Sequence, residues 1–201
     1  MEVDPLDTID RLEEASHADR ASMRLNTLVA ITIAILATFM GICKVKDDNI
    51  VQSMQQAQAD KLDHWAYFQA RNIREEVADA TLEQLRLASP AAPQSAQATY
   101  AAAIQRYEAL SADQAKKKEL LKAQAEQDQK DYDAANYHDD QFDLSDALIS
   151  IAISLLAMTA LTHKRWLYIV ALVPTGFGLI MGLAGLLGWK IHPDILIKML
   201  S

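Results

Sequence analysis

Ser89-Pro90-Ala91-Ala92-Pro93 joins two polar, alanine-rich stretches of nearly equal length, Lys44 to Ala88 and Gln94 to Asp140. Both stretches lack glycine and consist largely of residues that form helices at exposed positions. The two prolines are the only strong helix breakers between them. The pattern predicts two helices of about 45 residues, each roughly 65–70 Å long, that fold back on each other as an antiparallel hairpin.

Three apolar stretches flank this polar middle. Leu25 to Cys43 and Trp166 to Trp189 contain no charged residue, and Asp146 is the only charge between Leu144 and Thr162. Each stretch has about the length that a helix needs to cross a hydrocarbon core of roughly 30 Å. We therefore predict an all-α fold with a polar leader at 1–24, transmembrane helices at 25–43, 142–162 and 166–189, an extramembrane helical hairpin at 44–141 with its turn near 89–93, and a short tail at 190–201.

Positive residues next to the spans predict the orientation, because they favour the cytoplasmic side. His163, Lys164 and Arg165 form the turn between the second and third spans, and Arg20 and Arg24 precede the first. We expect the N-terminus and the 163–165 loop to be cytoplasmic and the hairpin periplasmic, in the cytoplasmic (inner) membrane of a bacterium. The lysines at positions 44, 46 and 190 oppose this orientation.

The predicted hairpin has a thin apolar seam. If residues pair symmetrically about the turn, Leu62 lies opposite Leu121 and Val51 opposite Tyr132. Glutamine, lysine and aspartate occupy many positions between these pairs, and alanine buries little apolar area. A lone two-helix stalk of this kind is marginally stable. We therefore expect further burial against copies of the same chain, in a coiled-coil-like homo-oligomer.

Two groups of residues are candidates for oligomer or helix packing. Trp65 and Phe68 share a helical face, and together with Leu62 and Leu121 they form either the hydrophobic lock of the hairpin and its oligomer or a docking site for another protein. In the third span, the small residues Gly178, Gly182 and Gly185 are spaced so that a neighbouring helix can approach closely.

The acidic residues before and within the second span form the nearest approach to a reactive site. His138, Asp139, Asp140, Asp143 and Asp146 are candidates for a cation site or a pore mouth. The alternative is an acidic collar whose charges are solvated or favoured by a helix N-terminus.

The sequence offers few other signs of chemistry. No nucleophile–base pair or ligand set stands out, so we predict no catalytic residues, no cofactor and no enzyme activity. The single cysteine, Cys43, excludes an intrachain disulfide. The run of lysines at positions 116–118 is expected to be a solvated basic face in a net negative stalk, so no nucleic-acid partner is expected.

Three motifs carry a resemblance to a known family. They are Trp-x-x-Phe-Gln-Ala-Arg-x-Ile-Arg at Trp65–Arg74, His-Asp-Asp-Gln-Phe-Asp at His138–Asp143, and Lys-Arg-Trp-Leu at Lys164–Leu167. In this order, after one N-terminal span, they resemble a bacterial membrane protein family catalogued as domain of unknown function 4337. The resemblance implies a prokaryotic membrane protein and transfers no catalytic residue.

Two functions remain open. The first is a non-enzymatic homo-oligomeric membrane scaffold or adaptor whose helical stalk holds a partner, with itself, membrane lipid and another protein at the stalk as partners. The second is a channel or transport accessory with a path through the oligomerised spans. In that case Thr27, Thr32, Ser150 and Ser154 are the polar residues that would line the path, and Asp143 and Asp146 would lie near one mouth.

Overall fold

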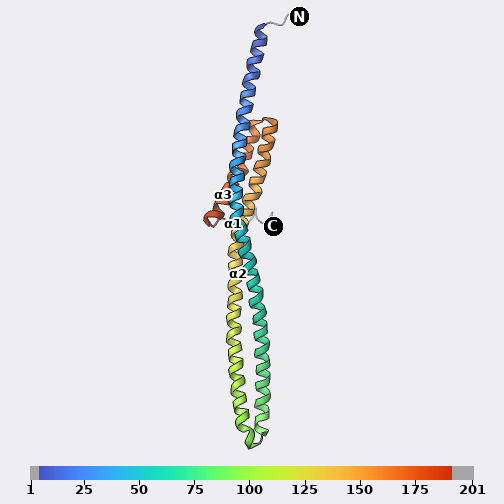
Figure 1. The fold of residues 1–201 in the computed structure, drawn as a ribbon, viewed down its shortest axis with the longest axis vertical. Helices are drawn as coiled ribbons and strands as arrows, with labels where there is room; N and C mark the ends of the chain where they lie inside the picture. Colours follow the sequence, from blue (N-terminus) through green and yellow to red (C-terminus); the bar gives the residue numbers. More distant parts are fainter. Residues whose placement is uncertain (1–4, 192–201) are drawn as a thin grey trace. The chain divides into compact units, whose positions relative to one another are not determined.

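The structure is a computed structural model that describes residues 5–191, with side chains from Arg20 onward. Its elements are α1 (Pro5–Ala88), the short 3₁₀ helices η1 (Ser89–Ala91) and η2 (Gln94–Ala96), α2 (Gln97–Thr162) and α3 (Arg165–Leu187) (Figure 1). No strand occurs among residues 5–191. The prediction of an all-α fold is confirmed.

The chain divides into two compact units. The three-helix unit contains the residues up to Val51 and those from Asn136 onward, and the two-helix unit contains Gln52–Ala135. Helix α1 contributes to both units, and so does α2. The predicted leader and tail extend beyond the described part of the chain at residues 1–4 and 192–201.

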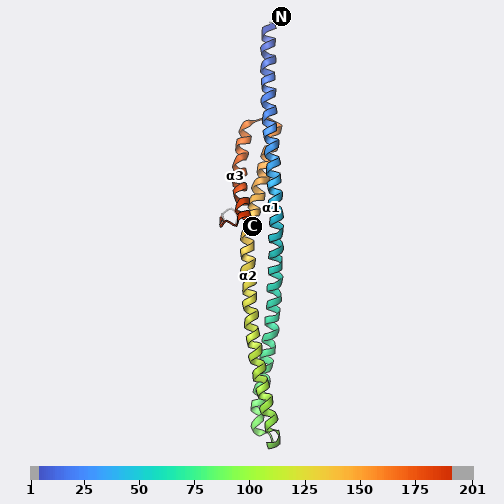
Figure 2. The same cartoon turned by 60° about the vertical axis from the view of Figure 1, so that its left-hand side comes forward.

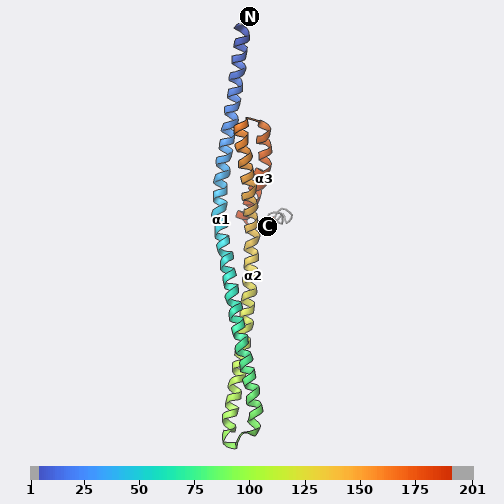
Figure 3. The ribbon, with the colours of Figure 1, turned by 90° about the vertical axis from the view of Figure 1, so that its right-hand side faces the viewer.

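Each of the three long helices contains a stretch that is long and apolar enough to cross a membrane. These stretches belong to the three-helix unit, where α3 lies alongside the last part of α2 (Figures 1 and 3). The residues that build the core come from all three helices: Leu25, Val29 and Leu36 from α1, Ile149, Ala152 and Leu156 from α2, and Ala171 from α3. Figure 2 shows the three helices side by side.

Close packing in this unit depends on positions without a side chain. A Cβ atom added to Gly178 would lie 2.8 Å from Ile149 Cγ1, and one added to Gly182 would lie 2.6 Å from Phe39 Cε1. At Gly185 the same atom would lie 2.7 Å from Phe142 Cζ. The three glycines named from the sequence are thus buried against α1 and α2 of the same chain.

The end of α3 is fixed by a left-handed residue and by a side chain from α2. Gly188 has φ +69°, a conformation that favours glycine, and the Trp189 amide donates to the carbonyl of Ala184 (2.8 Å). Gln141 Nε2 donates to the carbonyls of Trp189 (2.8 Å) and Ile191 (2.6 Å). The helix therefore ends at Leu187, two residues before the boundary expected from the apolar run.

In the two-helix unit, side chains connect the last part of α1 to the first part of α2. Arg86 Nη2 pairs with Glu108 Oε1 (2.6 Å), and Lys118 Nζ pairs with Glu75 Oε2 (2.6 Å). Further from the turn, His64 Nδ1 lies 2.6 Å from Asp128 Oδ2, and Lys61 Nζ donates to Gln129 Oε1. The turn itself contains both 3₁₀ helices and covers residues 89–96.

Most contacts between the two helices are shifted by about two helical turns from the predicted symmetric pairing, although the contact of Arg71 with Gln114 lies close to it. Symmetry about the turn would place Lys122 opposite Lys61 and Glu119 opposite His64, whereas the contacts are with Gln129 and Asp128. The physical reason for this shift lies in the polar side chains between the two helices. The symmetric register sets Lys61 against Lys122, whereas the observed one gives Lys61 the side-chain oxygen of Gln129 as an acceptor. Leu62, expected in the seam, is instead 60% exposed.

Candidate functional site

The acidic residues named from the sequence lie on α2, and the structure adds Asp47 and Lys44 from α1. Because α2 is helical throughout this segment, Asp139, Asp143 and Asp146 recur at intervals of four and three residues and share one face. Lys44 and Asp47 are three residues apart on α1 and share a face in the same way. We call these five residues the acidic cluster.

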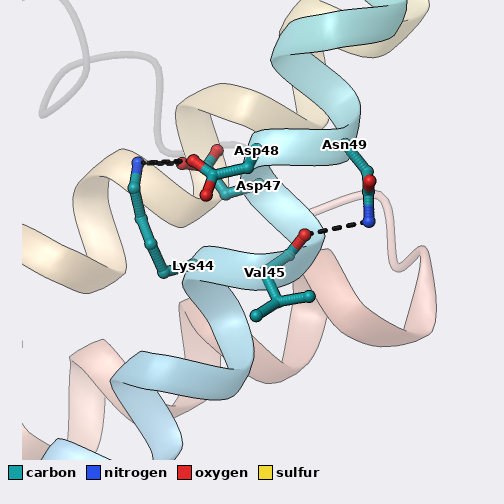
Figure 4. Close-up of polar contacts among 5 residues, drawn as sticks. All are labelled: Lys44, Val45, Asp47, Asp48 and Asn49. Carbon is teal, nitrogen blue, oxygen red and sulfur yellow. Dashed lines mark hydrogen bonds and ion pairs between the residues drawn. The ribbon is translucent and has the colours of Figure 1, made fainter.

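Asp47 is the buried member of the acidic cluster. Only 4% of the residue is exposed, and Lys44 Nζ donates to its Oδ2 at 2.7 Å (Figure 4). The same ammonium group lies 3.4 Å from Asp48 Oδ1. These contacts, chiefly the hydrogen bond to Asp47, raise the pKa of Lys44 above its usual value, so Lys44 stays charged. Asn49 Nδ2, on the next turn, donates to the Val45 carbonyl of its own helix (2.9 Å; Figure 4).

The second oxygen of Asp47, Oδ1, is buried without a hydrogen bond from any permanent donor among the described residues. The side chain of Asp139 donates a hydrogen bond to the Asp47 carboxylate when its own carboxyl carries a proton. Burial, the hydrogen bond to Asp47 and the charges of Asp143, Asp47 and Asp140 together raise the pKa of Asp139 to about 7. One proton shared between Asp47 and Asp139 therefore lowers the cost of burying two neighbouring carboxylates.

A small cavity of about 20 Å³ adjoins Asp47. Its wall includes Cys43, Lys44, Asp47, Asp143, Ser145 and Asp146. The volume suffices for about one water molecule, and the polar wall offers that molecule hydrogen-bond partners. The arrangement can bind and release a proton near neutral pH.

The other residues of the predicted cation site have local partners. His138 Nδ1 lies 3.0 Å from Gln141 Oε1, and Asn136 Nδ2 lies 3.4 Å from Asp140 Oδ2. In the part of the chain that the structure describes, no three histidine, cysteine, aspartate or glutamate side chains are grouped to hold a metal ion. The cation site stays a prediction from the sequence, without a ligand set among residues 20–191.

The packing residues predicted in the two-helix unit occupy different environments. Trp65 and Phe68 are half-buried and contact each other edge to face, with ring centroids 5.3 Å apart. Leu121 is half-buried in the wall of a groove of about 560 Å³ that Leu120 also lines. Leu62 is exposed.

Sequence reasoning missed Asp47 and Gln141 as site residues. Asp47 follows Lys44 by three residues, a spacing that indicates an ordinary surface ion pair. Nothing in the sequence shows that the Asp47 side chain is buried. Gln141 is completely buried, although it stands in a polar run where a solvated side chain is the ordinary expectation.

The fold and this cluster define an all-helical protein with three helices apolar enough to cross a membrane and a group of carboxylates where two of those helices meet. The family model described as domain of unknown function (DUF4337) matches residues 25–188. The chain belongs to this family, and the resemblance seen in its motifs is confirmed. Comparison with curated proteins finds no match, and neither does comparison with solved structures.

Proposed function

We propose that the protein is a non-enzymatic, homo-oligomeric membrane scaffold whose helical hairpin forms a stalk for assembly. The observation that carries this proposal is a stripe of exposed apolar side chains on α1 in the two-helix unit. Leu62, Ile73, Val77 and Leu87 are between 59% and 76% exposed. We call them the α1 stripe.

The α1 stripe lies on one helical face. From Ile73, its other members are 11, 4 and 14 residues away, which correspond to about three, one and four turns of helix. Smaller apolar residues, Ala66 and Ala80, fall on the same face and are exposed as well. Single exposed leucines need no explanation, but a stripe sustained over 26 residues of one helix is typical of an association surface.

A second copy of the chain is the partner that fits this stripe best. The two-helix unit buries few large side chains of its own, because its buried apolar residues are Met54, Ala78, Leu82 and Ala125. Self-association covers the stripe of each copy and adds the burial that a helix pair with so small a core requires. Another protein bound along the stalk is the alternative occupant.

The same proposal places the chain in the bacterial inner membrane, with the hairpin in the periplasm. It is supported by the three apolar helices, by Lys164 and Arg165 at the turn between α2 and α3, and by Arg20 and Arg24 before the first apolar stretch.

The test is the mass of the full-length protein in detergent, measured by light scattering at micromolar concentration. We expect more than one chain per particle, and we expect Ile73→Gln/Val77→Gln to lower that mass or to shift dissociation to higher concentration. The matched control is Tyr67→Gln/Leu110→Gln, which removes two exposed apolar side chains outside the stripe. A single-chain mass for the unaltered protein contradicts the proposal, and equal behaviour of the two variants contradicts the role of the stripe.

The channel hypothesis gains no specific observation from the hydroxyl residues it named. The hydroxyls of Thr27, Thr32 and Ser154 each donate to the carbonyl four residues earlier in their own helix. Hydroxyls satisfied in this way are compatible with a lipid-facing or a protein-facing position. We therefore retain the scaffold as the proposed function.

A further inference from the structure

A groove of about 310 Å³ lies between α1 and α3 in the three-helix unit, at the end of the spans marked by positive residues. Its polar members are two arginines, Arg24 from α1 and Arg165 from the start of α3. The rest of its lining is Ala21, Leu25, Leu28, Tyr168 and Ile169. The groove thus combines two fixed positive charges with an apolar wall.

Both arginines are available to a ligand. They are exposed, and neither forms an ion pair with any residue between Arg20 and Ile191. A guanidinium group presents a planar set of donors that matches two oxygens of a phosphate. Two such groups at one groove favour an anion.

The beginning of α3 adds to the positive potential. No side chain caps the first turn at Lys164, and that turn contains no acidic residue. Uncapped amide groups at the N-terminus of a 23-residue helix carry a partial positive charge toward the groove end where Arg165 stands.

The apolar wall continues from the arginines along the spans. Leu28 is one turn beyond Arg24 on α1, and Ile169 is one turn beyond Arg165 on α3. Both side chains are more than half exposed, and both belong to stretches apolar enough to lie in the membrane. A soluble anion would use only the arginines, whereas a lipid would also cover these side chains.

Local contacts hold the two walls in place. Tyr168 lies in the groove lining, and its hydroxyl is 3.1 Å from Thr32 Oγ1 of α1. Nearer the turn, Ser22 Oγ lies 2.8 Å from Nδ1 of His163, whose φ of +53° bends the chain between α2 and α3. The groove is therefore fixed on both sides before any ligand binds.

We propose that this groove is a binding site for one anionic phospholipid, whose phosphate lies between Arg24 and Arg165 and whose acyl chain follows Leu28 and Ile169. The site depends on the membrane location of the helices and is independent of the number of chains in the assembly.

The experiment is native mass spectrometry of the full-length protein in detergent, titrated with phosphatidylglycerol or with the zwitterionic phosphatidylcholine. We expect one phosphatidylglycerol per chain to bind about tenfold more tightly than phosphatidylcholine. Arg24→Gln/Arg165→Gln should abolish that preference. The control Lys46→Gln/Lys190→Gln removes the same charge from the other ends of the first and third spans and should retain it.

Three results would overturn the proposal. They are equal binding of the two lipids by the unaltered protein, an equal loss in both double variants, and displacement of phosphatidylglycerol by equimolar glycerol phosphate. The last result would show that the headgroup alone is recognised. Circular dichroism spectra of both variants establish that each remains helical, so a loss of binding reports on the groove.

Discussion

At the scale of single residues, the carboxyl groups of Asp47 and Asp139 form one interacting pair. Asp47 is buried with one oxygen held by Lys44 and one oxygen without a permanent donor. Asp139 lies close enough to share a proton with it, and its pKa is raised to about 7. The two carboxylates can both ionise only at the cost of repulsion across a poorly solvated contact.

The pH dependence of stability follows from the direction of that shift. The pKa of an aspartate in an unfolded chain is about 4. Because the pKa of Asp139 in the folded protein is about 7, the folded state binds more protons than the unfolded state between these values. The contribution to stability is therefore fully present below about pH 4 and is lost as the pH rises through about 7.

We expect Asp139→Asn to remove this dependence, because asparagine is neutral at every pH. The variant should be more stable than the unaltered protein at pH 8, by on the order of 1 kcal/mol after screening by solvent is allowed for, and the difference should be smaller at pH 5. Thermal unfolding in detergent between pH 5 and pH 8 measures the difference. Asp63→Asn, at an exposed aspartate of the two-helix unit, is the control, and a similar gain there would contradict the assignment.

The sequence locates Asp139 but not its partner. A run of acids before an apolar span is visible in the sequence, and it led to a cation hypothesis. Whether such acids are solvated or share a proton depends on which side chain of α1 faces them. That depends in turn on how two helix segments, whose residues Asp47 and Asp139 are 92 positions apart in sequence, are rotated against each other. Periodicity gives the face of each helix but not this rotation.

At the scale of helices, α3 is held against its neighbours by glycine positions and by one buried polar bond. Ser145 Oγ of α2 donates to the Gly178 carbonyl at 2.8 Å, a contact that requires close approach of the two backbones. Small residues at such contacts are the usual basis of helix association in membranes, where lipid offers no hydrophobic contrast. The spacing of the glycines predicts such packing, but it does not say whether the neighbour is in the same chain.

Adding one methyl group tests this packing. A Cβ at Gly178 would lie 2.8 Å from a side-chain atom and 3.3 Å from the backbone nitrogen of Ile149, so Gly178→Ala should destabilise the protein by about 1–3 kcal/mol. Gly176→Ala is the matched control, because nothing lies within 4 Å of its Cβ position and alanine is the better helix former. Thermal unfolding of both variants decides, and a loss at position 176 equal to that at 178 would contradict the packing role.

The register of the helix pair shows where pattern reading fails at this scale. Apolar positions alone favour pairing about the turn, since Leu62 and Leu121 then meet. With so few large apolar side chains, the polar contacts of Lys61, His64 and Lys118 have the larger influence on the register. Their partners can be recognised only once the helices are placed.

At the scale of the whole molecule, the lengths and hydropathy of the sequence segments predict most of the architecture. Apolar runs with few charges identify the membrane-spanning candidates, and the proline-containing turn divides the polar middle. The observed helix ends differ by a few residues from the predicted ones where a local feature ends the helix. Gly188 is such a feature at the end of α3. The groove proposed to bind a phospholipid was not predicted from the sequence, because Arg24 and Arg165 are far apart in the chain and indicated only the orientation.

The orientation itself is a prediction that single cysteines can test. We expect a cysteine at position 95, in the turn of the hairpin, to react with an impermeant maleimide in cells whose outer membrane has been permeabilised. A cysteine at position 164 should react only after lysis. The unaltered protein is the control, since its one thiol, Cys43, is buried. Labelling of position 164 but not 95 in unlysed cells would reverse the orientation.

The burial of Cys43 has a use beyond that control. Its thiol is the only one in the chain, is 5% exposed, and lies in the wall of the small cavity beside Asp47. A reagent can reach it only when α1 and α2 separate locally, so the rate of its alkylation under native conditions measures how often that opening occurs. Because the thiolate is the form that reacts, the rate at each pH is divided by that of the unfolded protein, and the ratio would report how often the two helices part as the shared proton leaves.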